Sequence, residues 1–135
     1  MMADALRVVL VDDEELVRSG LRLLLSNAPD IEVVAEASNG RDAVATVLDV
    51  QPDVVLMDIR MPVMDGIAAV EKILSVHAVP IIMLTAFDTD SFILRALRAG
   101  AAGFLLKSTP PESLMAAVRA AAAGQPLLSP QVVDK

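Results

Sequence analysis

The residues of this chain that could do chemistry are acids, a lysine and a threonine, and each stands where a run of aliphatic residues stops. Asp12 and Asp13 end the run in "VVLVDDEELV", and Asp58 ends the run "VVLMD". Thr85 ends "PIIMLT", and Lys107 ends "GFLLK". If these runs are parallel strands, their carboxyl ends meet at one edge of the sheet, and we expect these side chains to converge there.

Such a cluster is suited to phosphoryl transfer. Crowded carboxylates repel one another unless a cation neutralises them, and an all-oxygen set favours a hard divalent ion such as Mg²⁺. A lysine ammonium and a threonine hydroxyl supply the charge and the donor that phosphate oxygens require. Asp58 can then act as the nucleophile, because a carboxylate forms an aspartyl-phosphate when a metal and cations neutralise the incoming charge.

The composition argues against several other functions. Cysteine is absent, which removes disulfides and thiolate chemistry, and the single histidine, His77, falls late in a helical run, where we expect it on the surface. A formal charge of -7 and an aromatic content of 2% oppose a nucleic-acid surface, so any DNA contact must come from another segment. Neither a signal peptide nor an apolar run of ~20 residues is present, which predicts a cytoplasmic protein without membrane contact.

The elements that position the acids follow from the hydrophobic pattern. With 135 residues, 55% of them hydrophobic, the chain is expected to form one domain. Short aliphatic runs alternate with stretches of helical period, which predicts an α/β fold with a doubly wound parallel sheet and helices on both faces. Strands are predicted at 6–11, 32–37, 53–58, 80–85 and 103–107, and helices are predicted to begin near Glu14, Gly40, Met64, Asp88 and Pro111.

The last helix and the segment after it differ in character. The helix has an apolar stripe that we expect to be core or interface rather than a cofactor site, made of Leu114, Met115, Val118, Ala121 and Ala122. The stretch "QPLLSPQVVDK" at 125–135 has two prolines and no periodicity, which indicates a tail or linker.

As an ordered set, these motifs resemble the receiver domain of bacterial two-component response regulators. The resemblance is carried by the acidic pair after the first strand, by "VVLMDIRMPVMDG", by "MLTA" and by "AGAAGFLLKS", and it covers roughly residues 5 to 124. Three features are similar to the NarL/FixJ subfamily in particular: the segment "VDDEELVRSGLRLLL", Ser108 after the lysine, and the tail "GQPLLSPQVV". The resemblance implies a flavodoxin-like sheet of five strands in the order 2-1-3-4-5.

The resemblance also implies a role for each matching residue. Asp58 corresponds to the phosphoacceptor, and Asp12 and Asp13 correspond to the magnesium-binding acids, helped by the backbone carbonyl of Arg60. Mg²⁺ is therefore the implied cofactor.

Three further residues match the phosphate-contacting and switching positions of the family. Thr85 corresponds to the switch hydroxyl, Phe104 to the switch aromatic and Lys107 to the phosphate-contacting lysine. Pro62 and Gly66 would shape the loop after Asp58, with Gly66 allowing a close approach of the backbone.

By the same resemblance, residues 1–124 are a receiver and 125–135 begin a linker to an output domain outside this chain. A sensor histidine kinase, or a small acyl phosphate, would donate a phosphoryl group to Asp58 and so switch dimerisation and output. The expected output is transcription regulation through a LuxR-type DNA-binding domain. The chain would be a phosphoacceptor rather than an enzyme, with auto-phosphatase activity left open.

Simpler interpretations stand beside these roles. Asp13 could cap the first helix, Lys107 could be an edge charge, and Phe104 could be plain core. The other acids near the motifs are expected to serve helix starts rather than the site, namely Glu14, Glu15 and Asp65.

Three rival functions remain. An aspartyl phosphatase of the haloacid-dehalogenase type would have an acid two residues after Asp58, where this chain has Arg60. A flavin-binding flavodoxin-like module would have a Ser/Thr-rich loop and flanking aromatics, whereas this chain has acids and no Trp or Tyr. The last rival is a stand-alone or phosphate-independent receiver-like interaction module.

Overall fold

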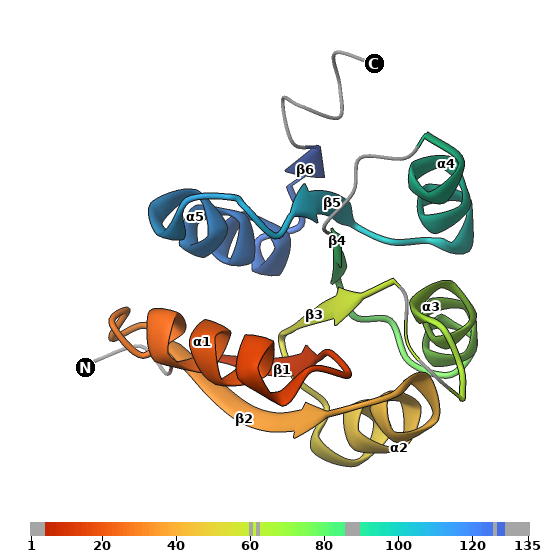
Figure 1. Ribbon diagram of the computed structural model, residues 1–135, viewed down its shortest axis with the longest axis horizontal. Helices are drawn as coiled ribbons and strands as arrows, with labels where there is room; N and C mark the ends of the chain where they lie inside the picture. The colour runs from red at the N-terminus through yellow and green to blue at the C-terminus, as the bar shows by residue number, and fades with distance from the viewer. Residues whose placement is uncertain (1–4, 60, 62, 86–89, 126, 129–135) are drawn as a thin grey trace.

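The computed structural model describes residues 5–59, 61, 63–85, 90–125 and 127–128. Strands and helices alternate along the chain, in agreement with the predicted α/β pattern (Figure 1). The strands are β1 (Leu6–Val11), β2 (Ile31–Ala37), β3 (Val54–Asp58), β4 (Ile81–Thr85), β5 (Gly103–Leu106) and β6 (Leu127–Leu128). The helices are α1 (Glu15–Leu25), α2 (Gly40–Val50), α3 (Gly66–Leu74), α4 (Asp90–Ala99) and α5 (Pro111–Ala122).

All the strands pair in parallel, in the order β2-β1-β3-β4-β5-β6. The five predicted strands and their order are therefore confirmed, with ends that differ by one residue at most. The two-residue strand β6 was not predicted. It comes from the segment expected to be a linker and pairs with the edge of β5, where Gly103 lies opposite Leu127.

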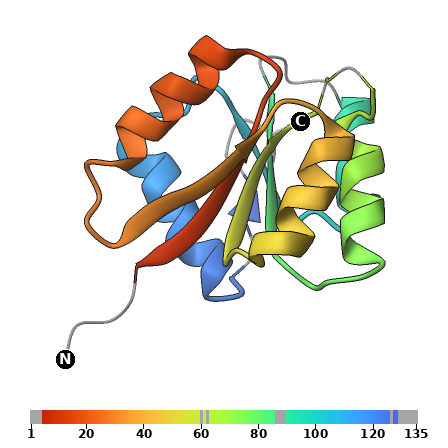
Figure 2. The ribbon, with the colours of Figure 1, turned by 90° about the horizontal axis from the view of Figure 1, so that it is seen from below.

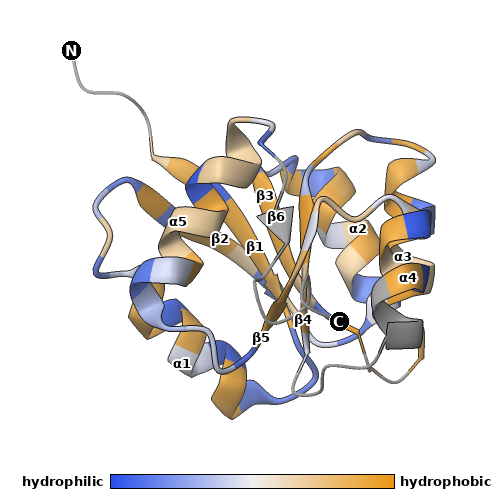
Figure 3. Ribbon diagram, turned by 90° about the horizontal axis from the view of Figure 1, so that it is seen from above, coloured by the Kyte–Doolittle hydropathy of each residue, from blue (hydrophilic) through white to orange (hydrophobic). Residues whose placement is uncertain are grey.

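The helices form two layers around the sheet. Figure 2 shows α1 and α5 on one side and α2, α3 and α4 on the other. Successive side chains of a strand point to opposite faces, so each strand contributes to two cores. Val9 and Met57 pack under α2 and α3, while Leu10 and Leu56 pack under α1 and α5. The central strands are accordingly hydrophobic along their length (Figure 3), as strands covered on both faces must be.

Two details of the helices differ from the sequence pattern. Helix α3 begins at Gly66 rather than near Met64, because Asp65 caps it: Asp65 Oδ1 accepts a hydrogen bond of 2.8 Å from the amide of Ala68. The buried stripe of α5 includes Ala117 but excludes Ala122, which is exposed. Among the described residues, no helix combines the length and the apolar character that crossing a bilayer requires.

Candidate functional site

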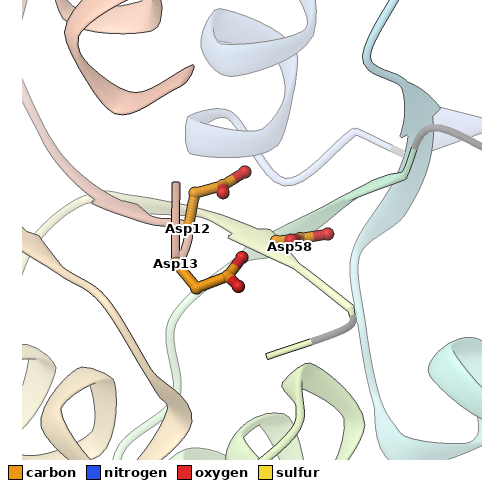
Figure 4. A group of neighbouring side chains, drawn as sticks. All are labelled: Asp12, Asp13 and Asp58. Atoms are coloured by element: carbon orange, nitrogen blue, oxygen red, sulfur yellow. The ribbon is translucent and has the colours of Figure 1, made fainter. Parts of the chain in front are cut away.

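The predicted acids meet at the carboxyl end of the sheet. Asp12 and Asp13 directly follow β1, and Asp58 is the last residue of β3, which is the neighbour of β1 in the sheet (Figure 4). One carboxylate oxygen from each lies within 4.8 Å of the others. Asp12 is 1% exposed and Asp58 is 7% exposed, whereas Asp13 faces solvent. The sheet thus brings together the acids that the sequence placed at separate strand ends.

Asp12 is held in place by its neighbours. Its amide donates to the carbonyl oxygen of Ala37 at 3.1 Å, and its Oδ1 accepts from the amide of Glu14 at 2.9 Å. Helix α1 begins at Glu15, and the side chain of its N-cap residue, Glu14, makes no capping hydrogen bond. The alternative in which Asp13 caps this helix is therefore wrong. The acid that bonds to the start of α1 is Asp12, and Asp13 stays exposed at the rim.

Lys107 reaches the acids from the end of β5. Strand β5 ends at Leu106, and the amide of Lys107 donates to the carbonyl oxygen of Thr85 at 2.7 Å. Its Nζ lies 2.8 Å from Asp12 Oδ2 and 3.4 Å from Asp58 Oδ2. Burial disfavours the ammonium, but pairing with Asp12 and Asp58 outweighs it and raises the pKa of Lys107. Lys107 is thus part of the acid cluster and is more than an edge charge.

Asp58 is the acid whose protonation the site perturbs. Burial raises the pKa of Asp58, the charge of Asp12 raises it further, and Lys107 opposes both, so that the pKa lies at about 6. A buried carboxyl group beside another carboxylate loses more from ionising than one in water. At neutral pH Asp58 is still mainly ionised, as a nucleophile has to be.

The donor set fits a hard divalent cation. Among the residues that the structure describes, Asp12 Oδ2 is the buried side-chain oxygen that accepts no hydrogen bond. Lys107 Nζ reaches it as an ion pair at 2.8 Å. Three carboxylates whose oxygens lie this close together form an all-oxygen cluster of the kind that Mg²⁺ occupies. Arg60, whose carbonyl is the remaining predicted ligand, lies outside the described residues, as does Pro62.

The two predicted switch residues lie on neighbouring strands, Thr85 at the end of β4 and Phe104 within β5. Thr85 ends β4 and is 7% exposed. Phe104 is fully buried and faces the core under α2, α3 and α4, together with Met83, its partner in the β4–β5 register. Phe104 is therefore core in this structure, and any switching role would start from a buried side chain.

Gly66 and Arg18 both lie against the backbone of the site acids. A Cβ atom at Gly66 would collide with the carbonyl oxygen of Asp58, which confirms the predicted close approach. Arg18 donates to the carbonyl oxygen of Asp12 at 2.6 Å, and sequence reasoning missed it. The sequence feature that could have identified Arg18 is its helical spacing, which places it on the same inward-facing stripe of α1 as Leu21 and Leu25. A cation in that place requires buried partners.

The doubly wound core of β1 to β5, with three acids and a lysine at its carboxyl edge, defines an α/β domain with a charged site at the ends of its strands. The family model of the response regulator receiver domain matches residues 8–119. The chain belongs to this family.

Curated relatives and a solved structure agree with this assignment. The chain is 45% identical to the uncharacterized transcriptional regulatory protein YxjL of Bacillus subtilis, an alignment that covers 93% of this chain and 58% of YxjL. It is 43% identical to the transcriptional regulatory protein LiaR of Bacillus subtilis, covering 96% of this chain and 62% of LiaR. The crystal structure of a LuxR-family two-component response regulator from Aurantimonas sp. SI85-9A1 superposes with a TM-score of 0.91 at 36% identity, covering 97% and 94% of the two chains.

The chain spans about three fifths of the length of the curated relatives it matches.

Proposed function

We propose that this receiver domain is switched by phosphorylation of Asp58 in a magnesium-dependent reaction. The observation that carries the proposal is the convergence of Asp12, Asp13 and Asp58 with Lys107 at one edge of the sheet. A phosphatase that uses an aspartyl nucleophile would have a second acid two residues after Asp58, and Arg60 occupies that position.

In the proposed reaction, a carboxylate oxygen of Asp58 attacks the phosphorus of a phosphohistidine or an acyl phosphate. A P–O bond forms, the bond from phosphorus to the donor breaks, and its electron pair leaves with the donor. Asp12, Asp13 and Asp58 would hold Mg²⁺, which when bound neutralises the carboxylates and the incoming phosphoryl oxygens. Lys107 would exchange its carboxylate partners for a phosphoryl oxygen.

The phosphoryl group would change the balance between two conformations. It adds negative charge and acceptor oxygens beside Thr85 and Lys107, which supply a hydroxyl donor and a cation. We propose that Thr85 moves toward these oxygens and that Phe104 follows, because the two residues lie on neighbouring strands. Hydrolysis of the aspartyl-phosphate at the same site would reset the domain as an auto-phosphatase step.

The proposed partners follow from the family and from the relatives. A sensor histidine kinase would supply the phosphoryl group in the cytoplasm, and phosphorylation would favour a homodimer. YxjL and LiaR are described as transcriptional regulatory proteins. Residues 1–124 would accordingly be the receiver of such a regulator, joined through 125–135 to a LuxR-type DNA-binding domain.

Phosphorylation can be tested with acetyl phosphate and Mg²⁺, using intact-mass spectrometry to count the phosphoryl groups acquired. We expect one group on the parent chain and none on Asp58→Asn, and beryllofluoride should perturb the NMR resonances of Lys107 and Thr85. A parent chain that stays unmodified and gives no beryllofluoride response would refute the proposed function.

The two pairs of neighbouring acids provide a matched control. Replacing Asp12 and Asp13 by asparagine should abolish binding of Mg²⁺, because it leaves one carboxylate of the cluster. Replacing the adjacent Glu14 and Glu15 by glutamine should leave most of the binding intact, because both are exposed and neither belongs to the cluster. Equal losses in the two double variants would indicate general charge attraction instead of a defined site.

A further inference from the structure

Arg18 is a mostly buried cation directly behind the acid cluster. Its side chain extends from α1 and is 16% exposed. Its Nη1 donates to the backbone carbonyl oxygen of Asp12 at 2.6 Å, and its Nε donates to Glu36 Oε1 on β2 at 3.1 Å. One guanidinium therefore links α1 and β2 to the residue that follows β1.

The bond to Asp12 acts on the peptide group between Asp12 and Asp13. That peptide is planar, so holding the carbonyl of Asp12 in one direction also sets the direction in which the chain enters Asp13. The amide and Oδ1 of Asp12 are fixed separately, by Ala37 and by Glu14. The Arg18 bond is thus the contact that orients the link from the buried acid to the exposed one.

Arg22 shows that joining α1 to β2 does not need this bond. It lies one turn further along α1 and also pairs with Glu36, at 2.7 Å. Its side chain is 58% exposed, whereas the guanidinium of Arg18 is turned inward toward the backbone of Asp12. Desolvating an arginine costs free energy unless its donors are hydrogen-bonded. Arg18 uses one nitrogen to bond Glu36 on β2 and another to bond Asp12 after β1.

We propose that Arg18 is a positioning residue for the metal-binding acids. By holding the peptide between Asp12 and Asp13, it sets how the chain leaves the buried Asp12 and so directs the Asp13 carboxylate toward Asp12 and Asp58. This inference rests on the proposed function, because it assumes that the cluster binds Mg²⁺. Groups that orient ligands from outside a metal site commonly change metal affinity 10- to 100-fold when they are removed.

The test compares Arg18→Gln, Arg18→Lys and the matched control Arg22→Gln. Calorimetric titration measures the Mg²⁺ affinity, and amide exchange without metal measures the protection of the Glu14 amide, which donates to Asp12 Oδ1. We expect Arg18→Gln to weaken Mg²⁺ binding about tenfold or more and to speed exchange of this amide. Arg22→Gln should change neither, although it also loses a bond to Glu36.

Arg18→Lys keeps a charge and a donor, so it should recover part of the affinity. This variant also keeps the test decisive if Arg18→Gln fails to fold. Equal Mg²⁺ affinity in the parent, Arg18→Lys and Arg18→Gln would overturn the positioning role while leaving phosphorylation of Asp58 intact. Equal losses in Arg18→Gln and Arg22→Gln would overturn it as well, because the effect would then come from the shared partner Glu36. A parent chain that binds no Mg²⁺ would overturn both this inference and the proposed function.

Discussion

Gly66 lies directly against Asp58. A Cβ atom at position 66 would overlap the carbonyl oxygen of Asp58 and would stand 2.9 Å from the Cα atom of Ile59. The amide of Gly66 also donates to the carbonyl oxygen of Ile59 at 2.7 Å. The missing side chain therefore sets how closely α3 approaches the end of β3, where the proposed phosphoacceptor is.

Gly66→Ala should destabilise the fold and disturb the site. The atoms that the new methyl group would meet are mainly backbone, which cannot rotate away, so we expect a loss of about 1–3 kcal/mol in the free energy of unfolding. Thermal or urea unfolding measures this loss. Gly20→Ala is the control: a Cβ there meets nothing within 4 Å. Because Gly20 lies in the middle of α1, Gly20→Ala should raise the free energy of unfolding by about 0.5–1 kcal/mol. A Gly66→Ala chain as stable as the parent would contradict the close contact.

Lys107→Ala should raise the pKa of Asp58 above its value of about 6, because the lysine charge is what lowers it against burial and Asp12. NMR titration of the carboxyl carbon of Asp58 measures the shift directly. Lys72→Ala is the control, since Lys72 is exposed in the last turn of α3. An unchanged Asp58 titration in Lys107→Ala would show that the ammonium does not act on this carboxylate in solution.

Asp58 should make the stability of the metal-free chain fall as the pH rises. Its pKa is 3.8 when unperturbed and about 6 in the folded chain, so the folded state holds the proton more tightly. The stabilisation from this proton is complete below 3.8 and is lost as the pH rises through about 6. Asp58→Asn cannot ionise and should be more stable than the parent at neutral pH, by on the order of 1 kcal/mol after screening by water.

Urea unfolding of both chains over a pH series tests this linkage. The stability difference between Asp58→Asn and the parent should shrink as the pH falls below about 6. Adding Mg²⁺ should stabilise the parent more than the variant, because the metal takes the place of the proton. Parallel pH profiles for the two chains would show that Asp58 does not titrate in this range.

Val63, between β3 and α3, carries backbone strain. Its φ angle is 71°, in the left-handed region that β-branched residues disfavour, and its side chain is 69% exposed. Val63→Gly should therefore raise the free energy of unfolding by about 1 kcal/mol, the relief of strain exceeding the added flexibility of the unfolded chain. Val76→Gly is the control, being 65% exposed without a positive φ, and should be neutral or destabilising. Destabilisation of both chains to the same extent would contradict the prediction for Val63.

The sequence was sufficient to predict five of the strands and the five helices, and the family resemblance implied the order 2-1-3-4-5 of those strands. Strands covered on both faces must be apolar along their length, so runs such as "VVLM" and "IIML" mark them without knowledge of the fold. The acids at Asp12, Asp13 and Asp58 could be assigned to one edge for the same reason, since parallel strands place their carboxyl ends together. The close approach at Gly66 was expected from the family resemblance, and glycine permits it because it has no Cβ atom.

The tertiary structure decided what depends on three-dimensional neighbours. That Asp12, and not Asp13, bonds to the start of α1 depends on how the chain turns after β1. The bond from Arg18 to Asp12 depends on which face of α1 meets the sheet. The pKa of Asp58 depends on burial and on charges that are distant in the sequence. Hydrophobic periodicity is a local property of the chain, so the fold could be predicted from the sequence. The environment of a charge is set by residues that only folding brings close, so the pKa values and ion pairs of the site could not be predicted.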